Sequence, residues 1–97
     1  MSATSKLNTL RELQRIPGVG LRVAEDLWNL GFRSVNELKD QDPEALYQRL
    51  CQQQRHQVDR CMLYVLRCAV YYASNKSHER ELLKWWNWSD MALQPQS

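Results

Sequence analysis

Apolar side chains recur at the spacing of α-helices along most of the chain, and no segment keeps the strict alternation typical of a half-exposed strand. Residues 7–15 and 21–30 form the first two amphipathic segments, and Gly31 follows the second at a position where glycine commonly ends a helix. The sequence Ser-Val-Asn-Glu, which begins at Ser34, has the form of a capping box and predicts a short third helix. The first third of the chain is therefore expected to be helical.

The remaining two thirds of the chain continue the helical pattern. Asp42 has the properties of an N-cap and Pro43 those of a first helical residue, which predicts a helix that reaches about Gln54. Residues 56–73 are apolar on most faces, so we expect the longest helix here, at the centre of the core. A last short helix is expected over residues 79–88. The whole pattern predicts an all-α fold of five to six short helices with a long central helix in the C-terminal part.

Length and composition bound the class of protein. A chain of 97 residues is expected to form one domain, over residues 1–97, with residues 91–97 as a frayed tail. The net charge of +2 is weak, so any binding to nucleic acid should be local and salt-sensitive. No apolar run reaches the length of a membrane span, and the polar start lacks a signal-peptide core. We therefore expect a cytoplasmic protein without membrane contact.

The turn between the first two predicted helices carries the most informative motif. Its sequence is Ile-Pro-Gly-Val-Gly, residues 16–20, with Arg22 and Ala24 just beyond it, and it resembles the helix-hairpin-helix motif. Both glycines are expected to take positive φ and to leave room for another backbone, while Val19 points inward and Ala24 lets the helices pack closely. Free amides and the helix dipole at the start of the second helix favour an anion. We predict that the turn binds nucleic-acid phosphate through Gly18, Val19, Gly20, Leu21 and Arg22.

Such a turn can also be a scaffold that joins two helices and touches no ligand. Residues 31–38 resemble the second, degenerate hairpin of tandem helix-hairpin-helix domains, because they follow the first hairpin closely but lack the Gly-x-Gly turn. We interpret this second hairpin as a packing unit. The predicted fold thus contains a tandem hairpin unit in which only the first turn is a candidate phosphate site.

The chain beyond residue 41 carries a specific combination of short motifs. They are Asp42-Pro43-Glu44, Leu46-Tyr47, Leu50-Cys51, Asp59-Arg60-Cys61, Leu63-Tyr64-Val65, the run from Arg67 to Ala73, and the run from Leu83 to Trp88. Together they resemble the small bacterial helix-hairpin-helix family described as "pathogenicity locus" proteins, some of which carry a mitomycin-resistance label. The resemblance covers nearly the whole chain and implies a bacterial source and an all-α, hairpin-containing fold. It implies little about biochemistry. One departure is Gln-Gln-Gln-Arg at residues 52–55, where we expect a glycine.

Three cysteines, Cys51, Cys61 and Cys68, occur in the predicted helices. With His56 they offer the ligand types of a tetrahedral zinc site. The spacing argues against one, because Cys61 and Cys68 lie about 10 Å apart along a helix axis and no Cys-x-x-Cys occurs. We expect three buried, reduced thiols that hold no metal and no cofactor, with a redox role as the remaining alternative.

A second candidate surface alternates cations with aromatic rings. Arg60, Tyr64, Arg67 and Tyr71 follow one edge of the long predicted helix. The arginines could bind phosphates while the tyrosines stack on a base or a partner. We favour the structural interpretation, in which the tyrosines are half-buried, the arginine stems lie over them, and Asp59 pairs with one arginine.

Three tryptophans, Trp85, Trp86 and Trp88, lie within four residues, next to Lys84. Neighbouring helical positions point about 100° apart, so the rings cannot all face one core. We expect Trp85 and Trp88 to face the bundle and Trp86 to be more exposed, although all three could cap a small core. The candidate partner surface consists of Arg60, Tyr64, Arg67, Tyr71, Lys84 and Trp86.

The sequence offers little support for catalysis. His56 and His78 are isolated, no pair of carboxylates stands out, and Leu21 and Arg22 stand where helix-hairpin-helix glycosylases carry a lysine. We predict no enzyme and no small-molecule substrate. The leading prediction is a non-catalytic module that binds the DNA backbone weakly and independently of sequence. The alternative, favoured by the weak charge, is a protein-interaction adaptor that uses the Trp-rich end and the Arg/Tyr stripe, with the hairpin only as scaffold.

Overall fold

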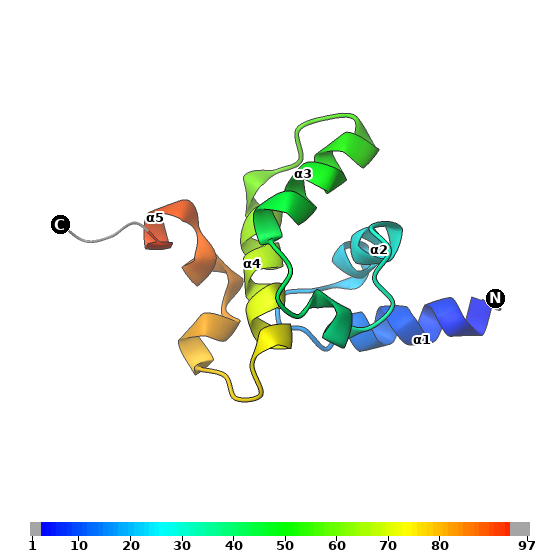
Figure 1. Ribbon diagram of the computed structural model, residues 1–97, viewed down its shortest axis with the longest axis horizontal. Helices are drawn as coiled ribbons and strands as arrows, with labels where there is room; N and C mark the ends of the chain where they lie inside the picture. The colour runs from blue at the N-terminus through cyan, green and yellow to red at the C-terminus, as the bar shows by residue number, and fades with distance from the viewer. Residues whose placement is uncertain (1–2, 94–97) are drawn as a thin grey trace.

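The computed structural model of the chain describes residues 3–93, and its regular elements are all helical in that range (Figure 1). The elements are α1 (Ala3–Leu13), α2 (Leu21–Asn29), the 3-10 helix η1 (Val35–Leu38), α3 (Pro43–Gln54), α4 (Arg60–Ser74), the 3-10 helices η2 (Arg80–Leu83) and η3 (Trp85–Trp88), and α5 (Asp90–Leu93). The central helix α4 has α1 and α2 on one side and the C-terminal segment on the other. The predicted all-α fold with a long central helix is confirmed.

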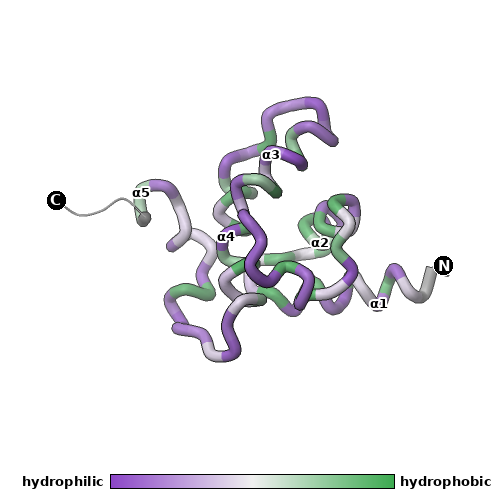
Figure 2. Tube along the Cα trace, viewed as in Figure 1, coloured by the Kyte–Doolittle hydropathy of each residue, from purple (hydrophilic) through white to green (hydrophobic). Residues whose placement is uncertain are grey.

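The core forms where α4 meets the other helices. Leu63 and Leu66 of α4 are completely buried, as are Leu13 of α1, Leu27 of α2 and Tyr47 of α3. Burying one such leucine stabilises the folded state by about 1.5–3 kcal/mol relative to leaving it in water. Apolar positions alternate with polar ones along the amphipathic helices, and polar residues dominate the loop between α3 and α4 (Figure 2).

Side-chain caps decide where α3 and α4 begin. Asp42 Oδ1 accepts from the amide of Glu44 at 3.0 Å, and α3 runs over the residues that the sequence predicts. Asp59 Oδ1 accepts from the amide of Cys61 at 2.9 Å, so α4 begins at Arg60, later than the predicted residue 56. The apolar Val58 extended the periodic pattern, but it packs against the core from the loop.

Other boundaries also differ from the predictions. The predicted helix over residues 79–88 is two 3-10 helices that are separated at Lys84. Residues 91–93 belong to α5 and not to a frayed tail, and residues 94–97 lie outside the described range. The predicted capping box does not form, because no described side-chain bond from Ser34 caps η1 and Glu37 Oε1 accepts from the amide of Arg33, one residue before the N-cap, at 3.2 Å. No helix in the described part of the chain has the length and apolar character needed to cross a bilayer.

Candidate nucleic-acid interface

The turn between α1 and α2 is closed by a bond from the amide of Val19 to the carbonyl of Ile16 at 3.0 Å. Both side chains are buried, and Ala24 is completely buried against them, so the predicted inward direction of Val19 is confirmed. Gly18 has φ of +86°, which suits a residue without Cβ. Gly20 is extended, at φ −91° and ψ −171°, so the expectation of positive φ at both glycines was wrong for Gly20.

The two glycines face different surroundings. A Cβ at Gly18 would lie 3.0 Å from Cδ1 of Trp85, so the group that approaches this glycine is a side chain and not the expected backbone. A Cβ at Gly20 would meet no described atom within 4 Å. Trp85 of the C-terminal segment therefore lies in the Cβ direction of Gly18, although Gly18 itself is exposed, whereas the Cβ direction of Gly20 is open.

The open side leads to the start of α2. Gly20 is the N-cap, no described side chain caps this end, and the first turn holds no acidic residue. The amide of Ala24 makes the first intrahelical bond, to the carbonyl of Gly20 at 2.9 Å. The three preceding amides therefore have no carbonyl partner within the helix. Leu21 and Arg22, the first two residues of α2, are exposed, as is Arg15 before the turn. The start of α2 therefore offers free amides and the cation of Arg22, the groups that an anion requires.

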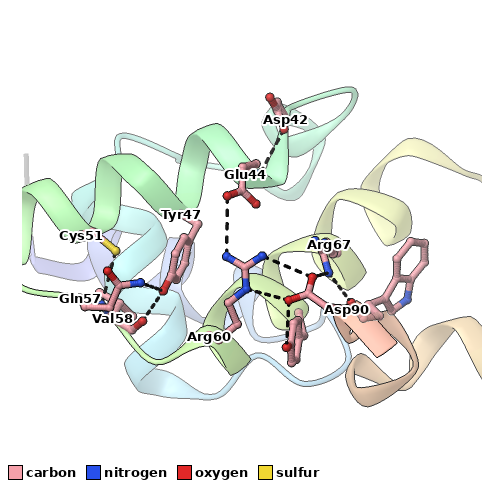
Figure 3. A network of polar contacts seen from close by, with 11 residues as sticks. Asp42, Glu44, Tyr47, Cys51, Gln57, Val58, Arg60, Arg67 and Asp90 are labelled. Carbon is pink, nitrogen blue, oxygen red and sulfur yellow. Dashed lines mark hydrogen bonds and ion pairs between the residues drawn. The ribbon is translucent and has the colours of Figure 1, made fainter. Parts of the chain in front are cut away.

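The Arg/Tyr stripe is occupied by a carboxylate of the C-terminal segment (Figure 3). Asp90 Oδ2 lies 2.8 Å from Nε of Arg60, and Asp90 Oδ1 lies 3.0 Å from Nη1 of Arg67. Tyr64 Oη donates to Asp90 Oδ2 at 3.3 Å. The two arginines lower the pKa of Asp90 to about 2, chiefly through the hydrogen bond from Arg60. The carboxylate partner is thus Asp90 and not the expected Asp59, which caps α4.

The same stripe also holds the backbone of the C-terminal segment. Arg67 Nη1 donates to the carbonyl of Trp88 at 2.8 Å, and Tyr71 Oη accepts from the amide of Glu79 at 2.9 Å. Tyr64 and Tyr71 are half-buried, as the structural interpretation of this stripe expected. The four stripe residues therefore lie together along α4, in contacts within the chain.

The tryptophans follow the predicted order of exposure. Trp86 is 54% exposed, whereas Trp85 and Trp88 are half-buried. Trp88 Nε1 donates to the carbonyl of Leu82 at 2.9 Å, and Trp85 meets Trp86 edge-on with ring centroids 5.8 Å apart. Lys84 lies beside them but is paired with a neighbour, Glu81, at 3.1 Å.

The three cysteines are unbridged and differ in exposure. Cys68 is buried, and burial raises the pKa of its thiol to about 11. Cys51 is half-buried and accepts from the amide of Val58 at 3.4 Å. Cys61 is exposed, so the expectation of three buried thiols was wrong there, because it lies on the outer face of the first turn of α4. Within residues 3–93, no cluster of three or more His, Cys, Asp or Glu side chains is placed to hold a metal ion.

Two features of this region were missed by sequence reasoning. The pairing of Asp90 with two arginines could not be predicted, because a single acidic residue is common at any exposed position of a sequence. A hollow beside α2 was also missed, because its lining comes from α2, from the end of α3 and from the start of α4. Only the folded chain brings those segments together.

Comparison with known proteins gives one match. The model of a protein family described as "Pathogenicity locus" matches residues 6–93, which is nearly the whole chain. No curated protein and no solved structure matches the chain.

Proposed function

The chain belongs to the pathogenicity locus family, and we propose that it is a non-catalytic module that binds the phosphate backbone of DNA through the start of α2. In this proposal the α1–α2 turn is a helix-hairpin-helix motif, and residues 31–38 form its degenerate second hairpin. The observation that carries the proposal is the open, extended N-cap at Gly20, beyond which no described atom lies within 4 Å of a Cβ position. A phosphate oxygen can approach the first amides of α2 without displacing any described side chain.

Charge near the turn supports the same proposal. Arg15 and Arg22 are exposed on the two sides of the turn, and neither makes a described ion pair. Arg60 and Arg67, by contrast, are both paired with Asp90, and Arg60 also lies 3.8 Å from Glu44. With only a few free cations and a net charge of +2, the module binds weakly and without reading sequence, since amide and cation contacts to phosphate carry no base information.

A salt-series titration of labelled duplex and single-stranded DNA tests the proposal. Arg22→Ala should weaken binding equally on all sequences and lower the salt slope by about one. Gly20→Val should also weaken binding, because its side chain would fill the approach to the amides while its ordinary φ lets the chain fold. Arg11→Ala is the matched control, since it removes an exposed arginine that belongs to α1 and not to the turn or to α2.

Two outcomes would overturn the proposal. One is a wild-type protein that binds neither DNA form at low salt. The other is a folded variant carrying both Arg22→Ala and Gly20→Val that binds as tightly as the wild type. Circular dichroism and a thermal transition for each variant establish that it is folded.

The second candidate function is a protein-interaction adaptor with the turn as scaffold. The observation that favours it is the exposure of Trp86, an aromatic side chain that proteins commonly bury at interfaces. The rest of the candidate partner surface supports it less, because Arg60, Arg67 and Lys84 are engaged within the chain. Loss of a protein partner on Trp86→Ala, with DNA binding absent from the wild type, would favour the adaptor.

A further inference from the structure

A hollow of about 360 Å³ lies beside the first two turns of α2, between that helix and the loop that joins α3 to α4. Apolar wall atoms come from Val23, Val58 and Met62. The polar side chains that line it are Arg22, Asp26, Gln54, His56 and Asp59. An apolar wall with a few converging polar groups is typical of sites that bind a small ligand or one ring of a larger one.

Contacts between α3 and the loop fix one wall of the hollow (Figure 3). Tyr47 is completely buried, and its Oη donates to the carbonyl of Val58 and accepts from Gln57 Nε2 at 3.0 Å. The amide of Val58 donates to Sγ of Cys51 at 3.4 Å. Because both backbone polar groups of Val58 are bonded, this wall is ordered before a ligand arrives.

The opposite wall carries a carboxylate with spare acceptor capacity. Gln54 Nε2 donates to Asp26 Oδ1 at 3.3 Å and links α3 to α2. No other donor to Asp26 occurs among the described contacts. Burial raises the pKa of the Asp26 carboxyl, while the nearby charge of Arg22 acts in the opposite direction. A partly buried carboxylate with one neutral donor is best satisfied by a ligand that brings further N–H groups.

The shape and chemistry of the lining select among the nucleobases. Guanine alone presents two adjacent donors, N1–H and N2–H, which match the two oxygens of one carboxylate. Adenine and cytosine place a ring acceptor beside their amino group, and thymine places its one donor between two carbonyls. A flat ring also suits the branched Val23 and Val58 and the polarisable thioether of Met62. Arg22 lines the hollow and belongs to the proposed phosphate contact as well, so one strand could reach both.

We infer that the hollow receives an unpaired guanine of the DNA strand whose phosphate is held at the start of α2, with Asp26 accepting from its N1–H and N2–H groups. The inference rests on the proposed function for its phosphate. The module would then recognise an unpaired base in addition to binding the phosphate backbone. Proteins that bind unstacked bases of single strands recognise nucleic acid in this way.

The test compares two short oligothymidine strands, one with a central guanine and one with a central abasic site. The guanine strand should bind the wild type at least about tenfold more tightly, because one charge-assisted hydrogen bond already contributes about that factor and two are proposed. Asp26→Asn should abolish that preference, because the amide puts an N–H where an acceptor is needed. Glu25→Gln is the matched control, since it removes the same charge from the neighbouring, exposed position of α2 and should keep the preference.

A second measurement follows the hollow directly. Guanosine 5′-monophosphate is titrated into the methyl-labelled full chain, and the methyl resonances of Val23 and Met62 should shift, whereas those of Leu82 in η2, on the other side of α4, should not. Cytidine 5′-monophosphate should produce smaller shifts. Absence of shifts at Val23 and Met62 would overturn the inference even if DNA binds.

The two proposals fail in different ways. If the guanine and abasic strands bind with equal affinity and Arg22→Ala weakens both, the guanine site is wrong. The proposal that the start of α2 binds the DNA backbone would then still stand. If neither strand binds but guanosine 5′-monophosphate shifts Val23 and Met62, the hollow is a nucleotide site and the DNA function is wrong.

Discussion

Trp85 lies against Gly18 so closely that a Cβ at the glycine would come within 3.0 Å of Cδ1 of the indole ring. The two residues lie far apart in the chain, one in the α1–α2 turn and the other in η3. Gly18 also has positive φ, so it is required twice, by its own backbone and by its neighbour. The turn and the C-terminal segment are therefore one packed unit.

Because only Gly18 is in contact with Trp85, substitutions at Gly18 and Gly20 should lower the stability by different amounts. Gly18→Ala should lower the free energy of unfolding by about 1–2 kcal/mol or more, because the new methyl group meets Trp85 and positive φ is unfavourable for alanine. Gly20→Ser should change it by only a few tenths of a kcal/mol, because Gly20 is an N-cap with open space beyond it. Urea titrations of both variants measure the difference. Equal destabilisation by both substitutions would contradict this account of the turn.

The ion pairs of Asp90 with Arg60 and Arg67 should make the stability of the fold depend on pH in the acid range. Its pKa of about 2 lies below the ordinary value of 3.8, so the ionised carboxylate is stabilised in the folded state. That contribution is complete above about pH 4 and is lost as pH falls from 4 through 2. At neutral pH, Asp90→Asn should therefore unfold at a lower temperature than the wild type. The gap should shrink toward pH 2, because protonated aspartate and asparagine both lack the charge. A gap that is constant with pH would show that the ion pairs contribute nothing.

The tryptophans should differ in their contribution to stability. Trp85→Ala removes a half-buried ring from Gly18 and should cost up to about 3 kcal/mol. Trp86→Ala should cost well under about 1 kcal/mol, because 54% of that residue is already in solvent. Thermal transitions of the two variants provide the comparison. If Trp86→Ala destabilises as strongly as Trp85→Ala, the exposed ring belongs to the core and the adaptor loses its best surface.

The thiols should react with an alkylating reagent in the order of their exposure. Cys61 should be modified first in the native protein, because it is exposed. Cys68 should resist until the chain unfolds, because it is buried and its pKa of about 11 keeps it protonated at neutral pH. Mass spectrometry of timed samples identifies the sites. Early modification of Cys68 would contradict the packing of α4 against the C-terminal segment.

Local signals in the sequence were sufficient where local contacts decide the structure. The start of α3 is fixed by Pro43 and by the N-cap Asp42, whose side chain accepts from an amide two residues later. Gly31 follows α2 with φ of +104°, as its position predicted. The inward direction of Val19 also followed from the resemblance of the turn to the helix-hairpin-helix motif. Each of these features depends on residues within one or two helical turns, which the sequence displays directly.

The C-terminal segment could not be predicted in the same way. A single helix over residues 79–88 would have been the better local choice, but Trp85 packs on Gly18 and Asp90 binds two arginines of α4. These distant contacts favour two short 3-10 helices, because a break between them lets Trp85 and Asp90 reach different partners. The hollow beside α2 depends on the same kind of convergence, since no single segment contains its lining.

The backbone at the end of α3 bears on the glycine that was expected in residues 52–55. Arg55 ends α3 with φ of +58°, a conformation that glycine adopts at much lower cost. The glycine expected in residues 52–55 therefore corresponds to a real backbone requirement, which this chain meets with an arginine.

The packing of Trp85 on Gly18 also has a consequence for how the protein is made. Residues 16–20 are synthesised before Trp85, so the side of Gly18 that meets the indole ring stays uncovered until η3 has been made. A fragment cut after α4 would leave that side open to water. The turn therefore cannot be transferred alone into another scaffold, because part of its packing comes from Trp85 of η3.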